Sequence, residues 1–69
     1  MSDTPWIHDE VTRVVKNDEN LYTAARGYKR RYGIKEGAYA FHSAVGERLS
    51  KMIGHKVSKT AIVTVMRNV

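Results

Sequence analysis

Four successive segments of this 69-residue chain carry apolar residues at helical spacing, and this pattern constrains the fold more than any other feature. Apolar side chains at three- and four-residue intervals form a stripe along one side of a helix, and that stripe must be buried against a partner. Turn signals near Asn17-Asp18, at Gly33 and at Gly54-His55-Lys56 separate the segments. We therefore expect an all-α fold, a small bundle of three to four helices.

The first predicted helix covers about residues 5–16, with Thr4 as its N-cap. The second covers about residues 19–32, capped by Asp18 or the residue before it and ended by Gly33. Their apolar stripes are Ile7, Val11, Val14 and Val15 in the first helix, and Leu21, Ala24, Ala25, Tyr28 and Tyr32 in the second.

The third predicted helix, about residues 35–53, is closed by Gly54 and has the longest stripe, so we expect the others to pack around it. Close helix packing would explain Gly46 beside that stripe. The fourth covers about residues 59–68, with Ser58 as its cap. The apolar stripe of the third helix is Ala38, Phe41, Val45, Leu49, Met52 and Ile53. The stripe of the fourth is Ala61, Ile62, Val65, Met66 and Val69.

The last segment carries four consecutive β-branched residues, which makes a strand over residues 61–66 the alternative to a helix. We favour the helix, because strict alternation of apolar and polar residues fails and a lone strand would have no partner. Ser58 is a good cap, and Val57 and Ile62 are spaced as a hydrophobic staple around it.

The length predicts one small domain, residues 1–69, that buries roughly 60% of its unfolded surface, with residues 1–4 flexible. No apolar run is long enough to span a membrane, and the N-terminus lacks the basic start and apolar core of a secretory signal. The chain has no cysteine, which excludes disulfides, thiolate metal sites and cysteine nucleophiles and favours the cytoplasm.

The residues that could carry catalysis do not form a recognisable site, so we expect neither an enzyme nor a bound cofactor or metal. His8, His42 and His55 have no metal-binding spacing, and a half-buried, hydrogen-bonded role is the better interpretation of His42. No glycine-rich phosphate loop is present, and Glu36 and Glu47 lie too far apart along one helix to act as a pair.

Charge is unevenly distributed along the chain. Residues 1–20 contain five acidic and two basic side chains, whereas residues 21–69 contain ten basic and two acidic ones. A basic body behind an acidic first segment favours a polyanionic partner such as nucleic acid. We expect the acidic segment to face away from that partner, because carboxylates repel phosphates.

Residues 43–69 resemble the helix-turn-helix of DNA-binding regulators. An apolar helix ends at Gly54, a three-residue turn follows, and Ser58 opens a second helix. The resemblance implies that the last helix enters the major groove of double-stranded DNA. Phosphate contacts would come from Lys56, Lys59 and Ser58, and base contacts from Thr60, Thr64 and Arg67, with Val63 against a thymine methyl.

A second basic cluster, Arg26, Lys29 and Arg30, lies on the outer face of the second predicted helix and suits phosphate contacts beside the last helix. Tyr28 and Tyr32 belong to the predicted buried stripe, which argues against an independent single-strand site here.

The sequence thus predicts a small DNA-binding protein, a phage- or plasmid-type transcriptional regulator or accessory factor. A homodimer would add a second half-site, with Trp6, Met66 and Val69 as its apolar interface. The alternative is an inhibitor that docks onto a larger host protein, such as RNA polymerase or a nuclease, through the acidic first helix and Trp6.

Overall fold

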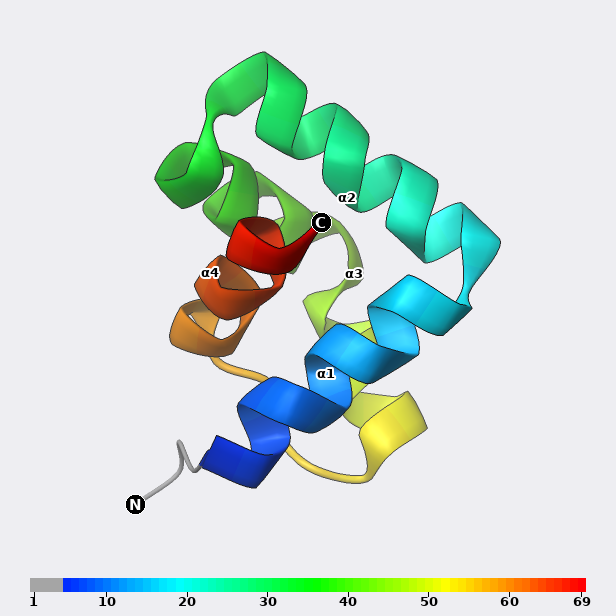
Figure 1. The fold of residues 1–69 in the computed structure, drawn as a ribbon. Helices are drawn as coiled ribbons and strands as arrows, with labels where there is room; N and C mark the ends of the chain where they lie inside the picture. Colours follow the sequence, from blue (N-terminus) through cyan, green and yellow to red (C-terminus); the bar gives the residue numbers. More distant parts are fainter. Residues whose placement is uncertain (1–4) are drawn as a thin grey trace.

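The structure is a computed structural model, and it describes residues 5–69 as a bundle of helices (Figure 1). No strand occurs in this range, so the predicted all-α class is confirmed. The expected cap Thr4 and the expected flexibility of residues 1–4 lie outside the described residues. The helices are α1 (Pro5–Asn17), α2 (Glu19–Tyr32), α3 (Ile34–Ile53) and α4 (Lys59–Asn68).

Local chemistry at the helix ends explains why the boundaries match the predicted ones so closely. The carboxylate of Asp18 accepts a hydrogen bond from the Leu21 N–H at 3.0 Å, and the Ser58 hydroxyl accepts one from the Ala61 N–H at 3.1 Å. Gly33 and Gly54 have φ values of 90° and 79°, which favour glycine, and each donates its N–H to a carbonyl four residues earlier.

The last segment is helical, which confirms the preferred interpretation over the strand alternative. The weak helix propensity of its β-branched residues is overridden by tertiary packing. Ala61, Ile62, Val65 and Met66 are all fully buried, and Ser58 caps the first turn. A strand over the same residues would turn half of these side chains away from the core.

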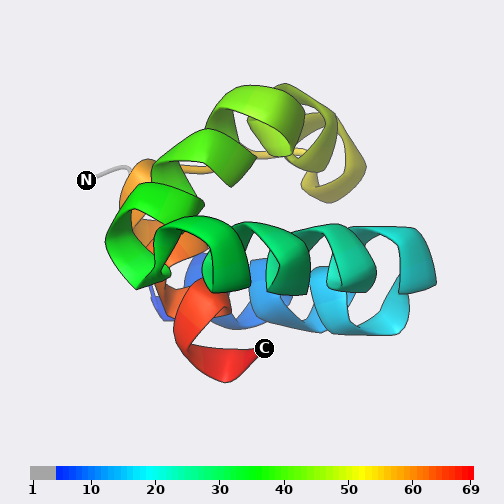
Figure 2. The same ribbon diagram turned by 90° about the horizontal axis from the view of Figure 1, so that it is seen from above.

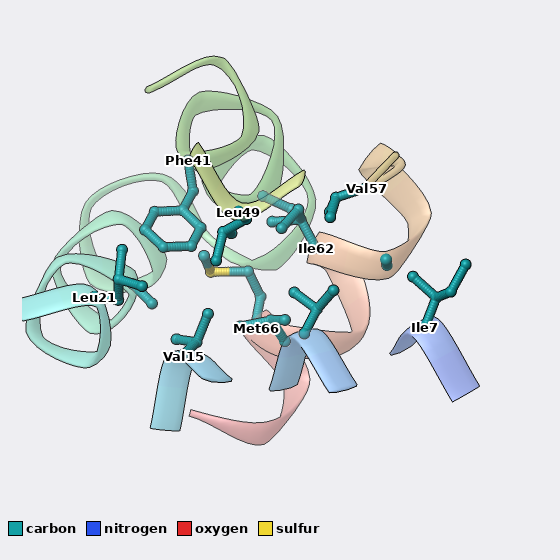
Figure 3. Packing of buried hydrophobic residues seen from close by; sticks show 13 residues of the cluster. Ile7, Val15, Leu21, Phe41, Leu49, Val57, Ile62 and Met66 are labelled. Carbon is teal, nitrogen blue, oxygen red and sulfur yellow. The ribbon is translucent and has the colours of Figure 1, made fainter. Parts of the chain in front are cut away.

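All four helices contribute to one apolar core, together with Val57 from the segment that connects α3 to α4 (Figure 3). Phe41, Leu49, Ile62 and Met66 are among its largest fully buried side chains. The full set is Ile7, Val11, Val15, Leu21, Ala25, Ala38, Phe41, Leu49, Val57, Ala61, Ile62, Val65 and Met66.

Two predicted core residues are exposed. Met52 is 52% exposed, since it lies in the last turn of α3 beside a surface hollow lined by Glu47, Arg48 and Lys51 of the same helix. Tyr32 is 47% exposed because α2 ends there, and its ring stacks on Tyr28 instead of entering the core. In both cases the helical stripe extends beyond the neighbouring helices.

The expectation that the other helices pack around α3 is only partly correct. Helix α3 packs extensively against α2 and α4 but touches α1 at few residues, and α1 packs mainly against α4 and α2. Figures 1 and 2 show α1 and α2 running side by side, and α3 packs directly against both α2 and α4. Helices α2 and α4 therefore both connect α1 to α3.

Close helix packing occurs at Gly37 and not at Gly46. A Cβ atom added to Gly37 would lie 2.8 Å from the main-chain oxygen of Tyr28, so the backbones of α2 and α3 meet at this residue. At Gly46 the added atom would meet the imidazole ring of His42 at 3.1 Å. The prediction for Gly46 was wrong because a side chain of the same helix fills the space.

The segment between α3 and α4 runs along α3 and is held by side chains of that helix. Nε2 of His42 donates a hydrogen bond to the Val57 carbonyl at 2.9 Å. The Ser50 hydroxyl accepts one from the Val57 N–H at 3.0 Å and donates one to the Gly46 carbonyl at 2.9 Å. The half-buried, hydrogen-bonded role predicted for His42 is confirmed.

We expect Leu49→Ala to lower the free energy of unfolding by about 2–5 kcal/mol, because it leaves a cavity in the core. Met52→Ala on the same helix should change stability little, since Met52 is exposed. Denaturant unfolding followed by circular dichroism measures both variants. Equal losses of unfolding free energy in the two variants would contradict the assignment of Leu49 to the buried side of α3 and Met52 to its exposed side.

A matched pair of glycine variants tests the approach of α2 to α3. Gly27→Ala should stabilise the protein by about 1 kcal/mol, because α2 gains helix propensity and the added methyl meets no atom within 4 Å. Gly37→Ala should destabilise it, because its methyl would collide with the Tyr28 main chain. A higher unfolding midpoint for both variants would rule out the close approach of the α2 and α3 backbones at Gly37.

Candidate nucleic-acid interface

The outer side of α4 is a narrow polar strip. Thr60 and Arg67 are exposed and lie seven residues apart, so they share one side of the helix at a spacing of roughly 10 Å along its axis. Val63 is partly buried against the core, so less of its side chain is presented on this strip than the sequence predicts. Two of the predicted base-contacting side chains, Thr60 and Arg67, therefore remain freely presented.

Thr64 does not point freely outward as predicted. Its hydroxyl oxygen lies 2.8 Å from Nδ1 of His8, so it forms a hydrogen bond with α1. It also donates, more weakly, to the Thr60 carbonyl at 3.4 Å. Helical periodicity places Thr64 on the polar side of α4, but the neighbouring helix covers that edge, and no sequence pattern reports the position of α1.

Ser58 also has a structural role. Its hydroxyl caps α4 through the Ala61 N–H, so the predicted phosphate contact from this side chain competes with the cap. Lys56 and Lys59 remain exposed at the same end of the helix. The ammonium group of Lys59 lies 5.3 Å from the ring centroid of Tyr39 on α3, a cation–π contact that orients it.

The predicted α2 cluster lies beside the other end of α4. Nζ of Lys29 donates a hydrogen bond to the main-chain oxygen of Val69 at 2.8 Å, and the Arg26 guanidinium lies 5.7 Å from the Tyr22 ring centroid. Arg30 is exposed. These residues share a surface hollow, here called the α2 groove, lined by Tyr22, Thr23, Arg26, Gly27, Lys29, Arg30 and Val69.

The predicted basic residues thus form two groups, one at each end of α4. Lys56 and Lys59 mark its first turn, and the α2 cluster adjoins Val69 after its last turn. Ten helical residues span roughly 15 Å, so the two groups are separated by about that length. Arg67 lies on the last turn of α4, close in sequence to Val69, which lines the α2 groove.

The acidic first segment does not face away from α4. Asp9 lines a shallow hollow that also contains Thr64 and Asn68 of α4 and Lys16 of α1. Near it, the Arg13 guanidinium donates to both oxygens of Glu10, and this hydrogen bond, with the charge of the carboxylate, raises the pKa of Arg13. Because α1 packs directly on α4, the acidic segment lies beside that helix, and its orientation relative to a polyanionic partner stays a prediction.

One of the three residues predicted for an apolar dimer interface, Trp6, Met66 and Val69, does not lie on the surface. Met66 is fully buried in the core, so it contributes nothing to a surface. Trp6 is 54% exposed, and its ring meets that of His55 edge to face, with centroids 5.8 Å apart. Trp6 therefore remains as an exposed aromatic side chain at the start of α1.

Within residues 5–69, no cluster of three or more histidine or acidic side chains is arranged to hold a metal ion. No helix in the described range is long and apolar enough to cross a membrane. Comparison with protein family models, curated protein sequences and solved structures finds no match to this chain.

The hydrogen bond between His8 and Thr64 should stabilise the contact between α1 and α4. We expect Thr64→Val to lower the free energy of unfolding by about 1 kcal/mol, because the valine side chain gives His8 no polar partner. Thr60→Val serves as the matched control, since Thr60 is exposed. An equal effect of the two variants in denaturant unfolding would contradict the placement of Thr64 against α1.

Proposed function

We propose that the protein binds double-stranded DNA through the outer strip of α4. The observation that carries this proposal is the placement of basic side chains at both ends of a helix whose outer strip contains no acidic residue in the described structure. Thr60 and Arg67 face outward between Lys56 and Lys59 at one end and the α2 cluster at the other.

The dimensions suit a helix lying in the major groove. That groove is roughly 12 Å wide and is bordered by phosphates on both sides. In the proposed complex Lys56 and Lys59 contact one sugar-phosphate backbone, and Arg26, Lys29 and Arg30 contact the other. Arg67 then reads a guanine edge, and Thr60 contacts a neighbouring base.

The order of elements supports a DNA-binding protein of the helix-turn-helix class. Helix α3 ends at Gly54 in the left-handed conformation, and α4 begins at the Ser58 cap, with His42 and Ser50 holding the connection against α3. Because only two base-reading side chains remain exposed on α4, two copies on adjacent half-sites would be needed for strong sequence preference. This is the arrangement of a small transcriptional regulator or accessory factor.

The exposed ring of Trp6 favours a second candidate, an inhibitor that docks onto a larger protein such as a polymerase or a nuclease. Exposed tryptophans dominate the binding energy of many protein interfaces. Trp6 lies at the start of α1 beside His55, away from the α2 groove in the sequence and in its contacts. Binding of this kind would depend weakly on salt, whereas phosphate contacts are lost steeply as salt rises.

Two substitutions should affect DNA binding differently if α4 enters the major groove. Arg67→Ala should weaken binding to the preferred site by about 1–3 kcal/mol and relax the preference at one base pair. Lys56→Ala should weaken binding to all duplexes and flatten the salt dependence by about one unit of slope. Fluorescence anisotropy on matched and scrambled duplexes at several salt concentrations separates the two effects.

Val65→Ala is the control for this experiment, because Val65 is buried and the variant should lose stability without a change in sequence preference. Unchanged DNA binding in both the Arg67 and Lys56 variants would exclude α4 as the DNA-binding element. If Trp6→Ala then abolished biological activity, docking onto a protein partner would take its place.

A further inference from the structure

Two hollows lie on the outer surface of α2, and Gly27 lines both of them. The first is the α2 groove beside the end of α4. The second is lined by Ala24, Gly27, Tyr28, Arg31 and Tyr32. Gly27, which has no side chain, is the residue common to both linings, and the two hollows are here called together the trough across α2.

The packing of the protein does not require a glycine at position 27. A Cβ atom added there would meet no other atom within 4 Å. A glycine inside an exposed helix lowers stability relative to alanine, and no packing contact explains the glycine at this position. A glycine in such a place allows a ligand to approach the backbone closely.

The side chains around the trough combine positive charge with accessible aromatic rings. Arg30 and Arg31 lie one helical turn beyond Gly27 and are exposed. Tyr32 is 47% exposed, and its ring stacks on that of Tyr28 with centroids 6.1 Å apart. Among the described residues, no acidic side chain lines either hollow.

This combination is characteristic of surfaces that bind unpaired nucleic-acid strands, where cations contact phosphates and aromatic rings stack on bases. The buried position predicted for Tyr32 argued against such a site, and its exposure removes that objection. A duplex cannot use the ring in this way, because its bases are already paired and stacked.

We propose that the trough across α2 binds a single-stranded nucleic acid. Phosphates cross the helix over Gly27 between Arg30 and Arg31, and one base stacks on Tyr32. The inference goes beyond the proposed function, because it assigns a second ligand, an unpaired strand, to the trough. The trough includes the α2 cluster, so the unpaired strand and the proposed duplex would share the cations of that cluster. DNA and RNA strands share this chemistry, and the experiment distinguishes them.

Fluorescence anisotropy with labelled oligothymidylate and oligouridylate tests the site in the full chain. The wild-type protein should bind at least one of these strands, and the better ligand identifies the kind of strand. Tyr32→Ala should weaken binding about tenfold through the loss of stacking, and Tyr32→Phe should retain it. Gly27→Gln should also weaken binding, because its side chain blocks the trough, although the variant should melt at a higher temperature than the wild type.

Tyr39→Ala is the matched control, because Tyr39 is similarly exposed but lies on α3, outside both hollows. Its binding of single strands should equal that of the wild type. The proposal is overturned if neither strand binds, if Gly27→Gln binds as well as the wild type, or if Tyr32→Ala weakens duplex and single-strand binding equally. The proposal that α4 binds duplex DNA is tested separately, by the affinity of the Arg67→Ala variant for duplex DNA.

Discussion

Enclosure of the apolar side of α4 by the other three helices is the constraint on which the rest of the structure depends. Helix α1 touches α3 at few residues, so α4, together with α2, holds both of them in one core. The same packing limits what α4 can present to a partner. Val63 and Thr64 are drawn toward neighbouring helices, and a strip with Thr60 and Arg67 remains.

The position of α4 depends in turn on the short segment that leads into it. An extended segment against a helix must find hydrogen-bond partners for its main chain. His42 and Ser50 supply them to the carbonyl and N–H groups of Val57, while the Val57 side chain enters the core. Gly46 leaves room for the His42 ring. Polar and apolar contacts at one residue thereby orient α4 on α3.

The glycines of the chain have different physical roles, which bear on the assignment of function. Gly33 and Gly54 adopt positive φ values at helix ends, and Gly37 permits close contact between two helices. Gly27 has none of these roles, which is why a ligand is the better explanation for it. The basic residues form two groups, Lys56 and Lys59 at the start of α4 and the α2 cluster beside its end, and the second group also lines the trough.

The sequence by itself determined the helices, their boundaries and most of the core, because caps, glycines and apolar periodicity act over a few residues. It also identified the exposed basic residues. Only the tertiary structure decided that α4 contacts every other helix, that Thr64 binds His8 and that Tyr32 and Met52 are exposed. Periodicity assigns a side to each helix, whereas the extent to which that side is covered depends on where distant helices end and cross.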